Sequence, residues 1–218
     1  MTSSRPFGKP RSPKGRARAA HLLLAEEYPD AICELDHTNA FELLAATIMS
    51  AQATDVGVNK VTPALFAAYP TPEALAAADQ ADVEAIIGSL GLFRSKAKNL
   101  IGMAQRLVAD FDGEVPTAMA DLVSLPGVGR KTANVVRSVA LGLPGLPVDT
   151  HVGRLVGRLG ITDETDPVKV ERILNPMIPA AERGEFSLRL ILHGRRVCGA
   201  RNPDCGACTL AWFCPSAR

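Results

Sequence analysis

Apolar residues recur along almost the whole chain at spacings of three and four, which is typical of amphipathic helices. In the segment 40–51, for example, Phe41, Leu44, Ala45 and Ile48 fall on one helical face. Runs of β-branched residues with alternating polarity, the pattern of strands, are missing. The sequence therefore predicts an all-α fold.

Capping and helix-breaking residues divide this pattern into successive segments. A Ser, Thr, Asp or Asn before an apolar run opens a helix, and a Gly or Pro after the run ends it. The expected helices are 16–28, 40–51, 55–69 with an interruption at Thr62-Pro63, one opened by Thr71-Pro72, a short one opened by Asp82, 95–111, one opened by Thr117, one from about 130 that ends before Gly142, one that follows Asp149, one opened by Asp166-Pro167, and 185–197.

The segment from Gly88 to Arg94, which contains a second glycine at Gly91, interrupts the helical pattern. It carries the apolar residues Leu90 and Leu92 on a loop. Apolar residues on such a loop pack into the core in most proteins. The functional alternative is a wedge that enters a stack of nucleic-acid bases.

The segment 125–134 predicts a very tight turn between two helices. Pro126 ends the first helix, while Gly127 and Gly129 allow backbone angles and close approaches that a side chain would prevent. The backbone N–H groups at the start of the second helix lack helical partners and lie at its positive end, so they would attract a phosphate.

Lys131 lies in the first turn of this second helix, next to Arg130. Once unprotonated, a lysine amine in such a place is a nucleophile. A P-loop would need Lys directly after the second Gly, and a dinucleotide-binding motif would need Gly where Thr132 stands, so both motifs are excluded. An ordinary turn with a solvated lysine remains the structural alternative.

Asp149 and His151 precede another amphipathic segment, eighteen and twenty residues after Lys131. Asp149 is suited to cap this helix, and the helix dipole would keep its carboxylate ionised. Capping and catalysis are compatible, since the cap fixes the rotamer of the acid. His151 is a candidate base, although a histidine in the first turn of a helix is more often structural.

Four of the five cysteines, Cys198, Cys205, Cys208 and Cys214, are separated by six, two and five residues. So dense a group on a loop with glycines and prolines indicates a metal site. Four thiolates bind either zinc or a [4Fe–4S] cluster, and the residues alone slightly favour zinc. Two disulfides fit poorly, because the pattern is not that of a secreted framework. Cys33 is interpreted as a buried apolar residue.

The composition, 218 residues with 47% hydrophobic residues and a net charge of +1, indicates a globular protein whose whole surface is not strongly basic.

No acidic residue precedes Glu26, so the start of the chain is basic. We expect residues 1–15 to form a disordered basic tail that either touches an anionic polymer or only aids solubility. We expect no secretory signal and no membrane span, with a transit peptide as the weaker alternative. A reducing, intracellular compartment is expected. Six basic residues precede Glu26: Arg5, Lys9, Arg11, Lys14, Arg16 and Arg18.

Taken in order, the segments 50–55, 125–132 and 148–151 and the cysteine spacing resemble the endonuclease III family, bifunctional DNA glycosylases of the helix-hairpin-helix superfamily. The likeness covers about Arg18 to the C-terminus. It implies a [4Fe–4S] cluster on the four cysteines, with zinc as the alternative. It also implies two helical domains that flank a DNA-binding cleft. One is a six-helix domain, 33–143, that contains the helix-hairpin-helix, and the other is a cluster domain, 16–32 plus 144–218.

The resemblance also implies roles for single residues. Lys131 would attack the anomeric carbon of a flipped nucleotide, expel the base and form a Schiff base, after which β-elimination cuts the strand. Asp149 would help to deprotonate Lys131 and stabilise positive charge on the sugar. Gln52 would fill the gap left by the extruded base, and Leu92 would wedge the opposite strand.

The hairpin residues Gly127, Gly129 and Arg130 would bind DNA phosphate. By the same resemblance, the substrate is double-stranded DNA that contains abasic sites or oxidised pyrimidines such as thymine glycol. The enzyme would be a monomer in the bacterial cytoplasm, associated with the nucleoid when it acts.

Two alternatives to this function stay open. A monofunctional mismatch glycosylase of the adenine-specific branch shares the cysteines and the aspartate but lacks the hairpin lysine, so the presence of Lys131 favours the bifunctional enzyme. A non-catalytic helix-hairpin-helix protein would bind DNA without cutting it. The basic N-terminal extension departs from the family pattern, and His37 and the segment 187–189 need not match it, which leaves the lesion preference open.

Overall fold

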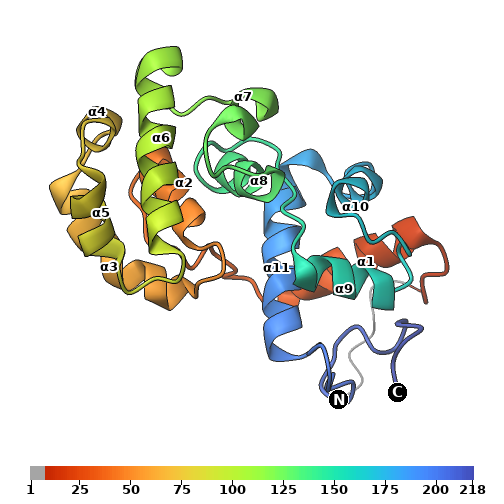
Figure 1. Ribbon diagram of the computed structural model, residues 1–218. Helices are drawn as coiled ribbons and strands as arrows, with labels where there is room; N and C mark the ends of the chain where they lie inside the picture. Colours follow the sequence, from red (N-terminus) through yellow and green to blue (C-terminus); the bar gives the residue numbers. More distant parts are fainter. Residues whose placement is uncertain (1–7) are drawn as a thin grey trace. The chain divides into compact units, whose positions relative to one another are not determined.

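The computed structural model describes residues 8–218, which form eleven α-helices and one short 3-10 helix (Figure 1). The all-α prediction is confirmed. The first seven residues of the expected basic tail lie outside the described residues. The helices are α1 (Pro13–Glu27), α2 (Ala40–Met49), α3 (Asp55–Ala68), α4 (Pro72–Ala76), α5 (Gln80–Ile87), α6 (Phe93–Phe111), α7 (Met119–Ser124), α8 (Arg130–Val139), α9 (Thr150–Arg158), α10 (Pro167–Leu174), η1 (Ala180–Glu182) and α11 (Arg183–Arg196).

The chain divides into two compact units. The hairpin unit is Cys33–Gly145 and contains α2 to α8, one helix more than the six implied by the resemblance, when the five-residue α4 is counted. The cysteine unit combines the residues up to Ile32 with Leu146–Arg218 and contains α1, α9, α10, η1 and α11. None of the helices within residues 8–218 has both the length and the apolar character needed to cross a bilayer.

The core of the hairpin unit forms around α6, which contacts α2, α4 and α5 (Figure 1). Its Ala97, Leu100, Met103, Ala104 and Leu107 are wholly buried, as the helical spacing of apolar residues predicts. The core of the cysteine unit forms where α11 packs on α1 and α9. Each unit therefore has a core of its own.

Two helices in this structure begin or continue where the sequence analysis placed a tail or a break. Helix α1 begins at Pro13, because the hydroxyl of Ser12 accepts a hydrogen bond from the Gly15 N–H (3.1 Å) and Pro suits the first helical position. Residues 13–15, expected in the tail, are therefore helical. Helix α3 continues through Pro63. An interior proline costs about 3 kcal/mol, but burial of Val58 and Leu65 on either side contributes about 1.5–3 kcal/mol each.

Four further helix starts differ from the expected ones. Helix α7 begins at Met119 after Ala118 and is not opened by Thr117, and helix α11 begins at Arg183, two residues early. Helix α5 begins at Gln80, because Asp79 and not Asp82 provides the cap and accepts a hydrogen bond from the Ala81 N–H (2.7 Å). Helix α6 begins at Phe93, two residues early, because Leu92 takes the N-cap position with a left-handed backbone.

Candidate active site and metal centre

The turn between α7 and α8 depends on two glycines. Gly127 has φ +77°, and a Cβ there would lie 2.9 Å from the Cβ of Asn99 on α6, so both the backbone and the available space require glycine. Gly129 is the N-cap of α8 and has open space where its Cβ would point. The backbone at this turn is therefore open to close approach by a ligand.

The start of α8 combines an uncapped helix end with two cations. The N-cap residue Gly129 has no side chain to cap the helix, and the first N–H groups of a helix have no partner within it. Lys131 is exposed in this first turn, and Arg130 is half-buried beside it. The helix dipole and these charges together favour an anion.

Asp55 and Lys131 both lie near enough to Cys33 to act on its thiol electrostatically, and all three residues belong to the hairpin unit. Burial raises the pKa of the Cys33 thiol, the carboxylate of Asp55 adds to the rise, and Lys131 opposes it. Asp55 begins α3 directly after its cap, Thr54. Cys33, interpreted from the sequence as a buried apolar residue, is half-buried and packs against the core of the hairpin unit.

Gln52 and Leu92 share an unusual backbone conformation. Their φ angles are +54° and +59°, in the left-handed region that costs a non-glycine residue about 1–2 kcal/mol. Both side chains are exposed. The loops that carry them are neighbours, because a Cβ at Gly57, near the start of α3, would lie 3.8 Å from a methyl of Leu90.

The structure separates the two apolar residues of the loop after α5. Leu90 is 5% exposed and belongs to the core of the hairpin unit, whereas Leu92 is 57% exposed. The structural interpretation of this loop therefore holds for Leu90, while the role of the exposed Leu92 as a wedge stays a prediction.

Asp149 is the N-cap of α9, as expected. Its Oδ1 accepts hydrogen bonds from the N–H groups of His151 (2.8 Å) and Val152 (2.9 Å). Its Oδ2 has no hydrogen-bond partner among the described residues, and Asp149 lines a pocket of about 510 Å³ in the cysteine unit. The cap fixes one oxygen and leaves the other for chemistry. The other residues around this pocket are Val148, Thr150, Gly153, Arg154, Glu164, Thr165, Pro167 and Val170.

The imidazole of His151 contacts Arg154 one turn further along α9, with Nδ1 3.1 Å from Nη2. Nη2 of Arg154 also donates to the carbonyls of Gly194 (2.9 Å) and Cys198 (3.0 Å). These contacts tie His151 to the packing of α9 on α11, which supports the structural interpretation over that of a free base.

The four C-terminal cysteines are free thiols gathered at the end of the cysteine unit. Burial raises the pKa of Cys208 to about 11, with the thiols of Cys198 and Cys214 adding to the rise. Burial also raises the pKa of Cys214, to which Cys198 and Cys205 contribute. The four sulfur atoms are therefore electrostatic neighbours.

Basic side chains from two helices contact this loop. Nη1 of Arg158 lies 3.2 Å from Sγ of Cys198 and 2.8 Å from the carbonyl of Gly199, and its Nη2 lies 2.7 Å from the carbonyl of Ala200. Nε2 of His193 lies 3.2 Å from Sγ of Cys208. Such N–H groups suit sulfur atoms that carry negative charge when they ligate a metal.

No three His, Cys, Asp or Glu side chains within residues 8–218 are placed so that they could hold a single metal ion. The fit of a metal group to this loop therefore rests on the chemistry of its donors: four thiols, one of which accepts from Arg158 and another of which lies 3.2 Å from Nε2 of His193.

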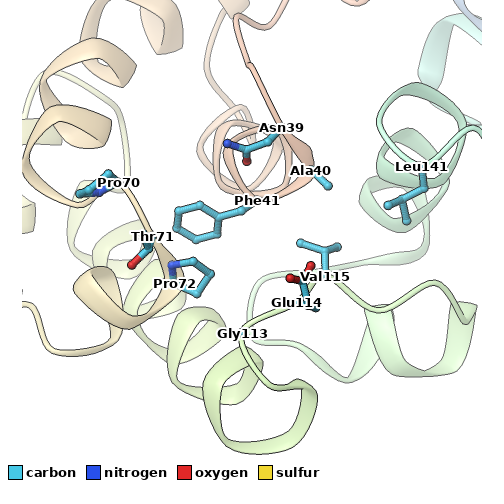
Figure 2. A pocket seen from close by; sticks show the side chains of 10 residues that line it. All are labelled: Asn39, Ala40, Phe41, Pro70, Thr71, Pro72, Gly113, Glu114, Val115 and Leu141. Atoms are coloured by element: carbon cyan, nitrogen blue, oxygen red, sulfur yellow. The ribbon is translucent and has the colours of Figure 1, made fainter.

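Several residues of these sites escaped the sequence analysis as site residues: Asp55, Asn99, Arg154, Arg158 and His193. Each was recognised only from its contacts in the structure, which helical periodicity does not encode. Asp55 belongs to the segment 50–55, on which the family resemblance partly rests, but no role was predicted for it. A separate hollow of about 250 Å³ in the hairpin unit, lined by Phe41, Pro72 and Glu114 among others, contains none of the predicted site residues (Figure 2).

This chain is similar to known proteins in both sequence and fold. Residues 45–180 match the model of the HhH-GPD superfamily base excision DNA repair proteins. Endonuclease III of Synechocystis sp. is 53% identical over 208 residues, 95% of each chain. Endonuclease III of Bacillus subtilis is 45% identical over 192 residues, 88% of each chain.

Solved structures give the same result. A structure described as a non-covalent endonuclease III–DNA complex matches with a TM-score of 0.88 and 44% identity, covering 94% of this chain and 96% of the other. A trapped covalent endonuclease III–DNA intermediate matches equally well. A thermostable thymine-DNA glycosylase shares the fold at 20% identity, with a TM-score of 0.85. The chain belongs to the endonuclease III family, within the HhH-GPD superfamily of base excision DNA repair proteins.

Proposed function

We propose that the protein is a base excision repair DNA glycosylase with AP lyase activity, which removes oxidised pyrimidines of the thymine glycol type from duplex DNA. The observation that carries the proposal is the exposed Lys131 in the first turn of α8, directly after an uncapped glycine turn. The relatives named endonuclease III and the endonuclease III–DNA complexes support it.

Lys131 provides the nucleophile. Its amine, after loss of one proton, forms a bond to the anomeric carbon of the damaged nucleotide while the glycosidic bond breaks and the base leaves with that electron pair. The sugar ring opens to a Schiff base with Lys131. Removal of a proton from C2′ then expels the 3′ phosphate, which cuts the strand on the 3′ side of the lesion.

Asp149 provides the carboxylate. Its Oδ1 is held by two backbone N–H groups at the start of α9, so the orientation of the side chain is fixed before substrate binds. Its free Oδ2 accepts a proton on the way from the amine and stabilises positive charge on the sugar.

Gln52 and Leu92 offset the free energy that is lost when a nucleotide is flipped out of the duplex. Extruding a nucleotide costs a few kcal/mol of stacking and pairing. A polar side chain at Gln52 fills the vacated position, and the exposed apolar side chain of Leu92 enters the opposite strand. The strained backbone at both positions is of the kind that proteins retain at functional sites.

The turn at Gly127 and Gly129, with Arg130 beside it, binds the DNA backbone. A phosphate at the start of α8 accepts hydrogen bonds from N–H groups that no side chain caps. Because Lys131 lies in the same turn, anchoring the strand there also brings the sugar toward its amine.

The cofactor that we propose is a [4Fe–4S] cluster held by Cys198, Cys205, Cys208 and Cys214, with zinc as the alternative. The donor set fits, since four half-buried thiols are electrostatic neighbours and two of them receive N–H groups. A bound cluster would supply four metal–thiolate bonds that close the loop, together with one-electron chemistry. Iron and sulfide analysis of the purified protein distinguishes cluster from zinc.

We further propose that the enzyme acts as a monomer in the bacterial cytoplasm, in association with the nucleoid. Strand cleavage of a thymine glycol duplex, without alkali or added lyase, tests the function. Excision without cleavage would instead indicate a monofunctional glycosylase, and binding without either would indicate a non-catalytic DNA-binding protein.

A further inference from the structure

His193 is a buried histidine that the proposed reaction does not use. It lies on α11 with an exposed fraction of 0%, and its ring packs edge-on against Tyr28 with centroids 6.0 Å apart. Nδ1 is 3.1 Å from the hydroxyl of Tyr28, and Nε2 is 3.2 Å from Sγ of Cys208. All of these groups belong to the cysteine unit, where the imidazole bridges the end of α1 and the cysteine loop.

Two groups face Nδ1. The hydroxyl of Tyr28 lies 3.1 Å away and Oε1 of Glu27 lies 3.5 Å away, and Glu27 also interacts with the Tyr28 hydroxyl. A carboxylate only accepts hydrogen bonds, so Tyr28 is the group that can donate to Nδ1 when the ring proton is on Nε2.

The chemistry of a metal ligand selects the same tautomer. A cysteine that ligates a metal is a thiolate without a proton, so its sulfur accepts hydrogen bonds and cannot donate them. The opposite tautomer would direct a nitrogen lone pair at this sulfur. The thiolate end of the ring therefore selects His193 Nε2–H donating to Cys208, with the Tyr28 O–H available to donate to Nδ1.

We infer that His193 is a positioning residue of the metal centre, whose Nε2–H donates to the Cys208 thiolate, raises the reduction potential of the cluster and slows its loss. This inference rests on the cofactor proposed above. Hydrogen bonds to ligating sulfur withdraw electron density and stabilise the reduced state, which makes the potential less negative. They also fix the orientation of the ligand, as outer-shell partners of metal sites do.

The hydrogen bond to the other sulfur provides an internal reference. Cys198 receives its N–H from Arg158, on a different helix. Changes at His193 remove the donor of one thiolate and leave the donor of the other in place. A change in the reduction potential or in the rate of cluster loss can then be attributed to the lost hydrogen bond to Cys208.

Three variants of the cluster-loaded protein separate the hydrogen bond from packing. His193→Gln keeps an N–H donor where Nε2 stood, and His193→Phe keeps a ring of similar size without the donor. Tyr28→Phe keeps the ring contact but removes the hydroxyl that holds Nδ1. Protein-film voltammetry measures the reduction potential, and the decay of visible absorbance under an iron chelator measures cluster loss.

We expect the potential of His193→Gln to stay near that of the wild type, the potential of His193→Phe to shift to more negative values, and that of Tyr28→Phe to lie between them. Cluster loss from His193→Phe should be about 10-fold faster, a typical effect of removing an outer-shell partner. A fully loaded His193→Phe protein with the wild-type potential would overturn the inference. If that variant does not hold a cluster, a wild-type potential in Tyr28→Phe overturns it.

Failure of the inference and failure of the proposed cofactor give different results. A wild-type protein without iron, sulfide and visible absorbance contradicts the cofactor itself. A loaded wild-type protein whose potential is unaffected by these variants contradicts only the role of His193.

Discussion

Oδ1 of Asp149 accepts a hydrogen bond from the N–H of His151 at 2.8 Å, so the proposed catalytic carboxylate is also the cap of its helix. Asparagine caps a helix about as well as aspartate does. Asp149→Asn should therefore keep the fold and the affinity for DNA but lower the single-turnover excision rate by about 100-fold or more, the usual contribution of a proton-transfer group.

Asp166→Asn is the matched control for this variant. Asp166 caps α10 in the same way, with Oδ1 2.9 Å from the N–H of Lys169, and has no role in the proposed site. Its excision rate should equal that of the wild type. An excision rate of Asp149→Asn equal to the rates of Asp166→Asn and the wild type would refute the role of Asp149.

Gly127→Ala should destabilise the hairpin unit by about 2 kcal/mol or more, because the left-handed backbone costs an alanine about 1–2 kcal/mol and its methyl meets Asn99. Gly129→Ala is the control, since its Cβ has open space, and should cost less than about 1 kcal/mol. Urea denaturation measures both values. Similar losses of stability in the two variants would show that the turn does not require glycine at position 127.

Leu92→Gly should leave the stability of the free protein unchanged or raise it, because glycine adopts the left-handed backbone without strain and Leu92 is already exposed. Excision should fall about 10-fold or more, since the wedge no longer offsets a few kcal/mol of unstacking. Val108→Ala, at a partly exposed site on the adjoining helix α6, should leave excision unchanged. The outcome that counts against the wedge is a Leu92→Gly enzyme as fast as the wild type.

The basic start of the chain offers a test of its two interpretations. Lys9, Arg11 and Lys14 are exposed, and a segment that touches DNA would neutralise phosphates there. Replacing all three with Gln should reduce the slope of log affinity against log salt by about 0.9 for each phosphate that these side chains neutralise in the wild type. An unchanged slope with lower protein solubility would support the solubilising tail instead.

The sequence predicted the helical class and much of the layout because both follow from local signals. The residues that apolar spacing placed on one face of α2 are buried, although most of the rest of that helix is buried as well, and Thr71-Pro72 marked the start of α4 correctly. Capping of α9 by Asp149 was also predicted, because a cap depends on neighbours within three residues.

Features that depend on distant contacts were missed. The continuity of α3 through Pro63 depends on burial of its flanking side chains, and the contact of His193 with Cys208 joins a helix to a loop. The start of α1 is a different case, because Ser12-Pro13 is a local capping signal that the basic, proline-containing composition of the segment obscured.

In the proposed reaction, Lys131 forms a covalent bond with the sugar of the damaged nucleotide. Sodium borohydride reduces a Schiff base to a stable amine, so wild-type protein mixed with a thymine glycol duplex and borohydride should yield a protein–DNA adduct. Peptide mapping should locate this adduct at Lys131, and Lys131→Gln, which leaves the hairpin glycines in place, should bind the duplex without forming it. An adduct of normal yield with Lys131→Gln, or one mapped to another residue, would show that Lys131 is not the nucleophile.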